Sequence, residues 1–189
     1  MAIELAPPQT ETLLTGEKAL ALGDIGPYEL IEGRIVYMSP TGVRHGDYEG
    51  NFYEHLKAFV RQHKLGKVVV GEVGVYIRRN PDTVRGVDVA FISTERYAQR
   101  QQTSGFLDVA PELIVEILSP DDRWNEVKQK LKEYFSIGVK VVWVADPADK
   151  TVTAYHSLTD MREFTLADAL TDDDVLAGFS VSVAELFED

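Results

Sequence analysis

Two acidic residues occur inside apolar segments, where a carboxylate is unexpected. Glu116 interrupts the run from Leu113 to Leu118, and Asp88 lies within Gly-Val-Asp-Val-Ala-Phe. Because burying an isolated carboxylate is very unfavourable, each acid needs a cation, a metal ion or a place at a strand end. Taken alone, Glu116 is explained equally well by an ion pair with an arginine, and Asp88 is explained better by an exposed edge strand.

Considered together, the two acids indicate metal chemistry. Hard cations such as Mg²⁺ bind a few carboxylate oxygens and keep waters that a substrate phosphate can replace. Such an ion lowers the pKa of water and stabilises charge on a phosphodiester in the transition state. A nearby lysine would complete the site by orienting or deprotonating the water and by neutralising the developing charge.

The segment after Glu116 offers two lysines for this role. At about 100° per residue, one stripe of this helix is apolar and is predicted to be its buried face. The stripe contains Trp124, Val127, Leu131, Tyr134 and Phe135. Lys130 lies just beyond one edge of the stripe and Lys128 lies at the other edge, so the helical geometry does not choose between them.

The remaining pattern predicts the elements that must position these residues. Helices are expected over 10–22, 44–63 and 119–137, the last one capped by Ser119 or one of the following aspartates. Strands are expected over 28–31, 34–38, 67–70, 74–78, 86–92, 113–118, 139–145 and 151–155, with a loop or frayed helix at 98–106 and weaker strand and helix patterns near the end. We therefore predict one α/β or α+β domain over 1–189, with a sheet flanked by helices on both sides and a flexible tail at 1–8.

Composition limits the partners. The formal net charge is −12, whereas DNA-binding domains usually show a basic surface. The acids gather near the two ends, while the bases gather in the middle: Lys64, Lys67, Arg78, Arg79, Arg85, Arg96, Arg100, Arg123, Lys128, Lys130 and Lys132. A basic face is therefore expected to bind nucleic acid with modest, salt-dependent affinity, although most of these charges are explained equally well by solubility. The sequence has no cysteine, no membrane-length apolar run and no signal-peptide pattern, so a cytoplasmic protein is expected.

Several ordered segments carry a resemblance to a known family. They are Tyr-Glu-Leu-Ile-Glu-Gly at 28–33, Met-Ser-Pro-Thr-Gly at 38–42, His45, the segments at 82–91 and 111–120, Lys130 with Tyr134 and Gly138, and Val-Trp-Val-Ala-Asp-Pro at 142–147. With these segments the chain resembles the bacterial Uma-two family of restriction-endonuclease-like proteins, placed in the PD-(D/E)xK nuclease superfamily. The resemblance implies a mixed sheet with flanking helices and an acidic site at one end.

The resemblance also assigns roles to single residues. It implies that Asp88 is the metal-binding aspartate and that Glu116 is the glutamate of the E-x-K half-motif, with the Ile117 carbonyl as a further ligand. Val87 stands at the motif's proline position, and Leu118 stands where the lysine should be. The family supplies its lysine from the next helix, four residues before a tyrosine, which implies Lys130.

Two residues are second-tier candidates. Glu72, in Gly-Glu-Val-Gly, would add an oxygen ligand or hold water, but a surface strand acid explains it better. His45 would contact phosphate or a site carboxylate, and a capping role at its helix start is an equal alternative. Trp143 and Tyr134 are predicted to be core residues.

The expected function is that of a Mg²⁺- or Mn²⁺-dependent endonuclease acting on DNA. A homodimer is also expected, because many such enzymes act as dimers to cut both strands. The first alternative is a nuclease-fold module for binding or assembly without useful catalysis, which the acidic charge favours. The second alternative is hydrolysis of a smaller phosphoester, which is less favoured because the sequence has no phosphate-binding glycine loop.

Overall fold

A mixed sheet of eight strands runs through the computed structural model, which describes residues 13–101 and 105–188. Its order is β2-β1-β4-β5-β6-β7-β8, and β3 pairs with β4 off this path. The strands of this sheet are β1 (Tyr28–Ile31), β2 (Arg34–Tyr37), β3 (Gly66–Arg78), β4 (Thr83–Ser93), β5 (Leu113–Ile117), β6 (Val141–Asp146), β7 (Thr151–Tyr155) and β8 (Met161–Phe164). A separate two-stranded sheet pairs β9 (Ala169–Thr171) with β10 (Ser180–Ser182).

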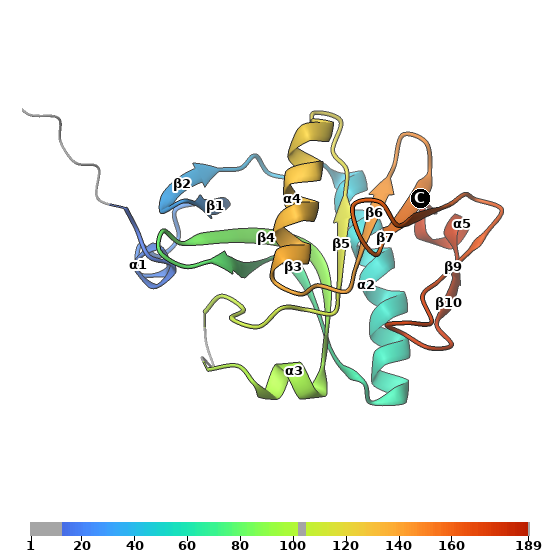
Figure 1. The fold of residues 1–189 in the computed structure, drawn as a ribbon. Helices are drawn as coiled ribbons and strands as arrows, with labels where there is room; N and C mark the ends of the chain where they lie inside the picture. The colour runs from blue at the N-terminus through green and yellow to red at the C-terminus, as the bar shows by residue number, and fades with distance from the viewer. Residues whose placement is uncertain (1–12, 102–104, 189) are drawn as a thin grey trace, which may run out of the picture.

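Helices cover both faces of the large sheet (Figure 1). Alternate residues of β5 divide between two cores, as expected for a strand buried on both faces. Val115 packs with Phe52 of α2 (Val43–His63), whereas Ile114 packs with Leu131 of α4 (Trp124–Ser136). The shorter helices are α1 (Gly16–Leu20), α3 (Thr94–Ala98) and α5 (Val183–Leu186). The predicted fold class, a mixed sheet flanked by helices, is confirmed.

The fourth helix differs from its prediction at its start. It begins at Trp124 with Arg123 as the N-cap, not at Ser119–Asp122. The backbone N–H of Ser119 instead donates to Asp122 Oδ2 at 2.7 Å, so these residues form a turn of their own. Trp124 was predicted to lie on the buried face but is 47% exposed, because the first helical turn extends beyond the core.

Two other predicted boundaries also change. The separate strands predicted at 67–70 and 74–78 form one strand, β3, because an irregularity interrupts its pairing without ending it. The first helix begins at Gly16, where the Thr15 hydroxyl caps it. The predicted tail at 1–8 and the predicted beginning of this helix lie outside the described residues. Within the part of the chain that is described, no helix is both long and apolar enough to cross a membrane.

The irregularity in β3 gives Glu72 an unusual position. The register with β4 shifts between Val70 and Val73, so β3 has one extra residue opposite β4. Gly71 has φ +90° and Glu72 has φ +54°. The second value is in the left-handed region, which non-glycine residues rarely adopt. The bulge thus re-aims the Glu72 side chain within an otherwise regular strand.

A second irregularity lies where β4 separates from β5. Their antiparallel pairing runs from Phe91↔Leu113 to Val89↔Val115 and stops before Asp88. The Ile117 N–H, which would otherwise need a backbone acceptor, donates to Asp88 Oδ2 at 2.7 Å. The strand order places β4 inside the sheet, and Asp88 is only 6% exposed. The exposed-edge interpretation of Asp88 is therefore wrong.

Candidate active site

Asp88 lies at the centre of a group of polar side chains on the separated strands. Its Oδ2 accepts the Ile117 N–H, which fixes the carboxylate, and its Oδ1 lies 3.6 Å from His45 Nε2. His45 belongs to the first turn of α2, and β4 carries Asp88 toward that helix start. One carboxylate oxygen is thus held by the backbone while the other faces an imidazole.

The two ring nitrogens of His45 are buried without a hydrogen bond. Neither Nδ1 nor Nε2 has a hydrogen-bond partner among the described residues. The facing Asp88 carboxylate raises the pKa of His45, and this effect exceeds the opposing effect of burial. Because buried polar atoms nearly always have a partner, the two ring nitrogens indicate that a further ligand belongs here.

Glu72 reaches the same place from the β3 bulge. One ligand atom each of His45, Glu72 and Asp88 lie within 4.8 Å of one another. Burial, and then the Asp88 charge, raises the pKa of Glu72. Glu49 of α2 lies beside the bulge, where its Oε1 accepts the Gly71 N–H at 2.7 Å. Two carboxylates and an imidazole at this spacing are a donor set that fits a divalent cation.

Glu116 accepts two side-chain hydrogen bonds next to this group. Its Oε2 accepts from Lys130 Nζ at 2.6 Å, and its Oε1 accepts from the Tyr134 hydroxyl at 2.6 Å. Burial raises the pKa of Glu116 to about 7, although Lys130 opposes the shift. Burial, the largest single effect, lowers the pKa of Lys130, but the charges of Glu116, Glu29 and Asp88 and the hydrogen bond to Glu116 together outweigh it, so the pKa lies above its usual value. Lys130 therefore remains an ammonium group held in place by Glu116.

The predicted site residues thus fall into two neighbouring sets. His45, Glu72 and Asp88 form the donor group, while Glu116 and Lys130 form an ion pair beside it. The Asp88 charge acts on both Glu116 and Lys130, which places the two sets within electrostatic range of each other. Ile117 contributes its N–H to Asp88, and the ligand role of its carbonyl stays a prediction.

The structure distinguishes the two candidate lysines on α4. Lys130 reaches Glu116, whereas the Nζ of Lys128 lies over the Trp124 ring, 5.7 Å from its centroid. Trp143 is fully buried, as predicted for the core. Tyr134 is also buried, but its bond to Glu116 is a role that the core prediction missed. The spacing of Lys130 and Tyr134 on one helix face was the signal that could have identified it.

An ion-pair network on the α4 side supports the site and was not predicted. Arg85, three residues before Asp88, contacts Glu29 Oε2 at 2.6 Å and Glu133 Oε2 at 2.7 Å. Glu29 also accepts the N–H of Gly86 at 3.2 Å. The network ties β1, β4 and α4 together, so it holds the strand that carries Asp88 against the helix that carries Lys130.

Several bases of the predicted basic face are engaged with acids in the same way. The bases in ion pairs are Arg78, Arg79, Arg85, Arg96 and Lys130. Pairing reduces the positive potential that these residues can offer to a phosphate backbone. The basic surface left for nucleic acid is smaller than the sequence suggested.

Comparisons with known proteins agree with the fold. A family model described as "Putative restriction endonuclease" matches residues 17–184. A solved structure described as "a putative nuclease belonging to DUF820 from Anabaena variabilis" superimposes with a TM-score of 0.76, covering 92% of this chain and 97% of that chain. The two sequences are 20% identical, so this likeness concerns the fold alone. The comparison with curated proteins gave no match.

Proposed function

The chain belongs to the Uma2 family, described as "Putative restriction endonuclease", and we propose that it is a divalent-metal-dependent endonuclease that hydrolyses DNA phosphodiester bonds. The observation that carries this proposal is the donor group of His45, Glu72 and Asp88, with ligand atoms within 4.8 Å of one another. Beside it lies a half-buried lysine, Lys130, whose ammonium group is held by Glu116. A cation site next to a positioned ammonium group is suited to phosphodiester hydrolysis.

Asp88, Glu72 and His45 would hold Mg²⁺ or Mn²⁺. The ion supplies positive charge to the phosphodiester transition state and lowers the pKa of water. An imidazole ligand favours Mn²⁺ over Mg²⁺, which prefers an oxygen environment. Glu116 has both carboxylate oxygens hydrogen-bonded, so it could act as a further ligand only by releasing Lys130 or Tyr134.

Lys130 would orient the attacking water and neutralise charge on the phosphate oxygens. Its raised pKa keeps the ammonium form at neutral pH, which suits this role better than that of a general base. Glu116 positions Lys130 through the 2.6 Å contact with Nζ, and Tyr134 restrains Glu116 from the other side. We therefore assign the hydrogen bonds that link Tyr134, Glu116 and Lys130 the role of holding the Lys130 ammonium group in place.

The acidic charge favours a second candidate, a nuclease-fold module that binds or assembles without catalysis. The net charge of −12 and the pairing of Arg78, Arg79, Arg85 and Arg96 with acids both weaken attraction to DNA. Since a fold does not guarantee an activity, this candidate needs a direct test.

The test is incubation of plasmid and single-stranded DNA with Mn²⁺ or Mg²⁺, using wild type, Asp88→Asn, Lys130→Ala and Lys128→Ala. Wild type is expected to cleave, and Asp88→Asn and Lys130→Ala are expected to lose about 100-fold or more in rate. Lys128→Ala is the matched control, because Lys128 lies over Trp124 and away from Glu116, and it should cleave like wild type.

Two outcomes would count against the proposal. Cleavage by Lys130→Ala at the wild-type rate would remove the assigned role of Lys130. A wild-type protein that retards DNA on a gel without cleaving it in either metal would favour the binding module.

A further inference from the structure

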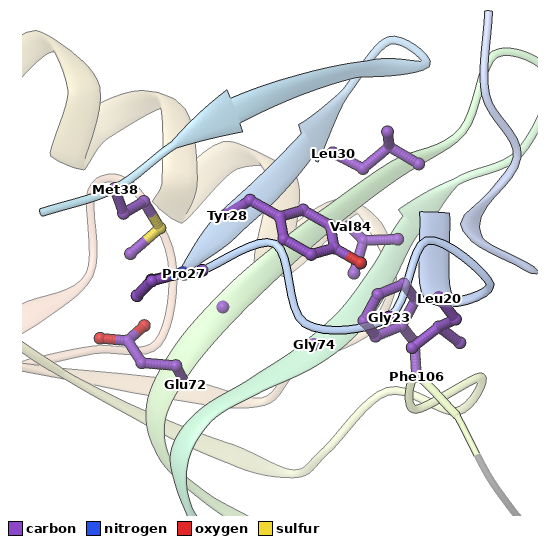
Figure 2. A pocket seen from close by; sticks show the side chains of 12 residues that line it. Leu20, Gly23, Pro27, Tyr28, Leu30, Met38, Glu72, Gly74, Val84 and Phe106 are labelled. Carbon is purple, nitrogen blue, oxygen red and sulfur yellow. The ribbon is translucent and has the colours of Figure 1, made fainter. Parts of the chain in front are cut away.

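A cavity of about 280 Å³ adjoins the donor group on the side of α1 (Figure 2). It lies between α1, the segment that leads into β1, and strands β3 and β4, and it shares Glu72 and Gly86 with the surroundings of Asp88. Figure 2 shows Glu72 and Met38 toward one end, Leu20 and Phe106 toward the other, and the Tyr28 ring between them. The cavity therefore leads from the donor group into a largely apolar space.

Two strand glycines, Gly74 and Gly86, allow the side chains that bound this cavity to lie close to the sheet. A Cβ at Gly86 would lie 2.9 Å from Glu72 Oε2, and a Cβ at Gly74 would lie 2.3 Å from Phe106 Cδ1. Without side chains at these two positions, the Glu72 carboxylate and the Phe106 ring lie close against the strands. The resulting space is bounded by an aromatic ring at one end and a carboxylate at the other.

The chemistry of the lining limits what can enter. Among the described residues that line the cavity, Glu72 is the charged one and none is a lysine or an arginine. A phosphate would meet the Glu72 charge with no cation to offset it, so phosphate is excluded from the interior. Tyr28 and Phe106 suit a flat ring, and the Glu72 carboxylate suits a ligand with N–H donors. An uncharged, flat, amino-bearing group has these properties, and nucleobases such as adenine and cytosine are of this kind.

We propose that this cavity receives the base of an unpaired nucleotide whose phosphate lies beside the divalent cation that the His45–Glu72–Asp88 group would hold. The inference rests on the proposed nuclease function and specifies its substrate. A base within a duplex is stacked and paired and cannot enter a side cavity, so the substrate is single-stranded or has a nucleotide turned out of the helix. Bases with an exocyclic amino group are preferred, because this group offers two N–H donors to the Glu72 carboxylate whereas thymine offers only its N3–H.

Nucleoside titration tests the cavity without requiring catalysis. Deoxyadenosine, deoxycytidine and thymidine are titrated into ¹⁵N-labelled protein in EDTA, and the backbone amide shifts of Gly74 and Gly86 are followed. Both amino-bearing nucleosides are expected to shift these amides saturably, and thymidine, which lacks the amino group, should bind about tenfold more weakly. Equal affinity for all three would overturn the role of Glu72, and no saturable shift with any of them would overturn the cavity proposal.

A pair of tryptophan variants supplies the matched control. Leu20 lines the cavity and is 39% exposed, so Leu20→Trp should fill the space and weaken nucleoside binding about tenfold. Leu22 lies two residues away, is 49% exposed and is not part of the lining, so Leu22→Trp should bind like wild type. Thermal unfolding of both variants establishes that they fold. Wild-type affinity in a folded Leu20→Trp would overturn the proposal.

The same variants separate this inference from the proposed function. If wild type cleaves single-stranded DNA and Leu20→Trp cleaves it at the same rate, the cavity proposal fails while the nuclease function stands. If nucleosides shift Gly74 and Gly86 but wild type cleaves no DNA with Mn²⁺, the proposed function fails while the cavity stands. Slower cleavage of single-stranded DNA by Leu20→Trp than by Leu22→Trp would support both.

Discussion

Strand β5 has a buried glutamate at each end, and the two are held in different ways. Glu112 precedes the strand, accepts the Ser93 N–H at 2.8 Å and pairs with Arg96 Nε at 3.2 Å. Arg96 also donates to the carbonyls of Ala110, Pro111 and Gly138, so its guanidinium links several loops. Glu116, near the other end, has its pKa raised to about 7 by burial, and the Asp88 charge contributes to the same shift.

This contrast separates a structural acid from a candidate catalytic one. Both glutamates are less than a tenth exposed, so burial alone does not distinguish them. The distinction lies in their neighbours. At the Glu112 end, the Arg96 guanidinium neutralises the acid and binds backbone carbonyls. At the Glu116 end, two further acids, Asp88 and Glu72, lie nearby. Several carboxylates gathered around one lysine destabilise the folded state, and such an arrangement is typical of functional sites.

The largest expected effect of a single substitution lies at the Glu112 end. Arg96→Ala should lower the free energy of unfolding by about 3–5 kcal/mol, because it leaves Glu112 buried without its cation. Urea unfolding measures this change. Mn²⁺ affinity in the folded variant should equal that of wild type, and a loss of affinity would show that the two ends of β5 are not independent.

The free energy of unfolding, measured over a range of pH, should show that ionised Glu116 destabilises the folded protein, in contrast to the paired Glu112. Its folded pKa, about 7, lies above its ordinary value near 4.5, so the folded state binds the proton more tightly. The stabilisation from this proton is fully present below pH about 4.5 and is lost as pH rises through about 7. In metal-free buffer, the unfolding free energy of wild type relative to Glu116→Gln should therefore fall by about 2–4 kcal/mol across that window. A difference that stays constant or rises with pH would contradict the raised pKa of Glu116 in the folded protein.

Tyr134→Phe should give a smaller effect at the same end. Removing the hydroxyl takes away a hydrogen bond to a buried carboxylate, which should lower the free energy of unfolding by about 2 kcal/mol. Tyr48→Phe is the matched control, because Tyr48 is also buried but packs in the apolar core, with its ring edge-to-face against Phe187. Equal urea midpoints for the two variants would show that Tyr134 serves packing alone.

The smallest effect is expected from a single methyl group on β4. In Gly86→Ala the added Cβ would lie 2.9 Å from Glu72 Oε2 and must displace that carboxylate. Mn²⁺ affinity, measured by calorimetry, should fall by about three- to tenfold. Gly50→Ala on α2 is the control: its Cβ meets nothing within 4 Å, so it should keep wild-type affinity and gain about 1 kcal/mol of stability. Unchanged affinity in Gly86→Ala would remove Glu72 from the donor group.

Strong local patterns predicted the fold well. The apolar run at 113–118 and the helical spacing of Tyr48, Phe52 and Leu56 lead to the observed β5 and α2, because each pattern reflects burial against the sheet. The start of α4 was misplaced because capping residues at Ser119–Asp122 form their own turn. A local signal of that kind does not distinguish a helix cap from an independent turn.

The site could be predicted only in part from the sequence. An acid in an apolar run drew attention to Glu116, but the choice of Lys130 over Lys128 depended on a family resemblance. Glu72 was ranked below a surface explanation because its position depends on a β3 bulge, and a bulge has no reliable signal in a single sequence. The link from Arg85 to Glu133 joins residues 48 positions apart and could not be read from local spacing.

The most direct test of the account is a calorimetric titration of Mn²⁺ into wild type, Asp88→Asn and Glu112→Gln. We predict one saturable site in wild type, binding at least about tenfold weaker in Asp88→Asn, and wild-type affinity in Glu112→Gln. Equal affinity in wild type and Asp88→Asn would contradict the assignment of the metal to the Asp88 end of the sheet.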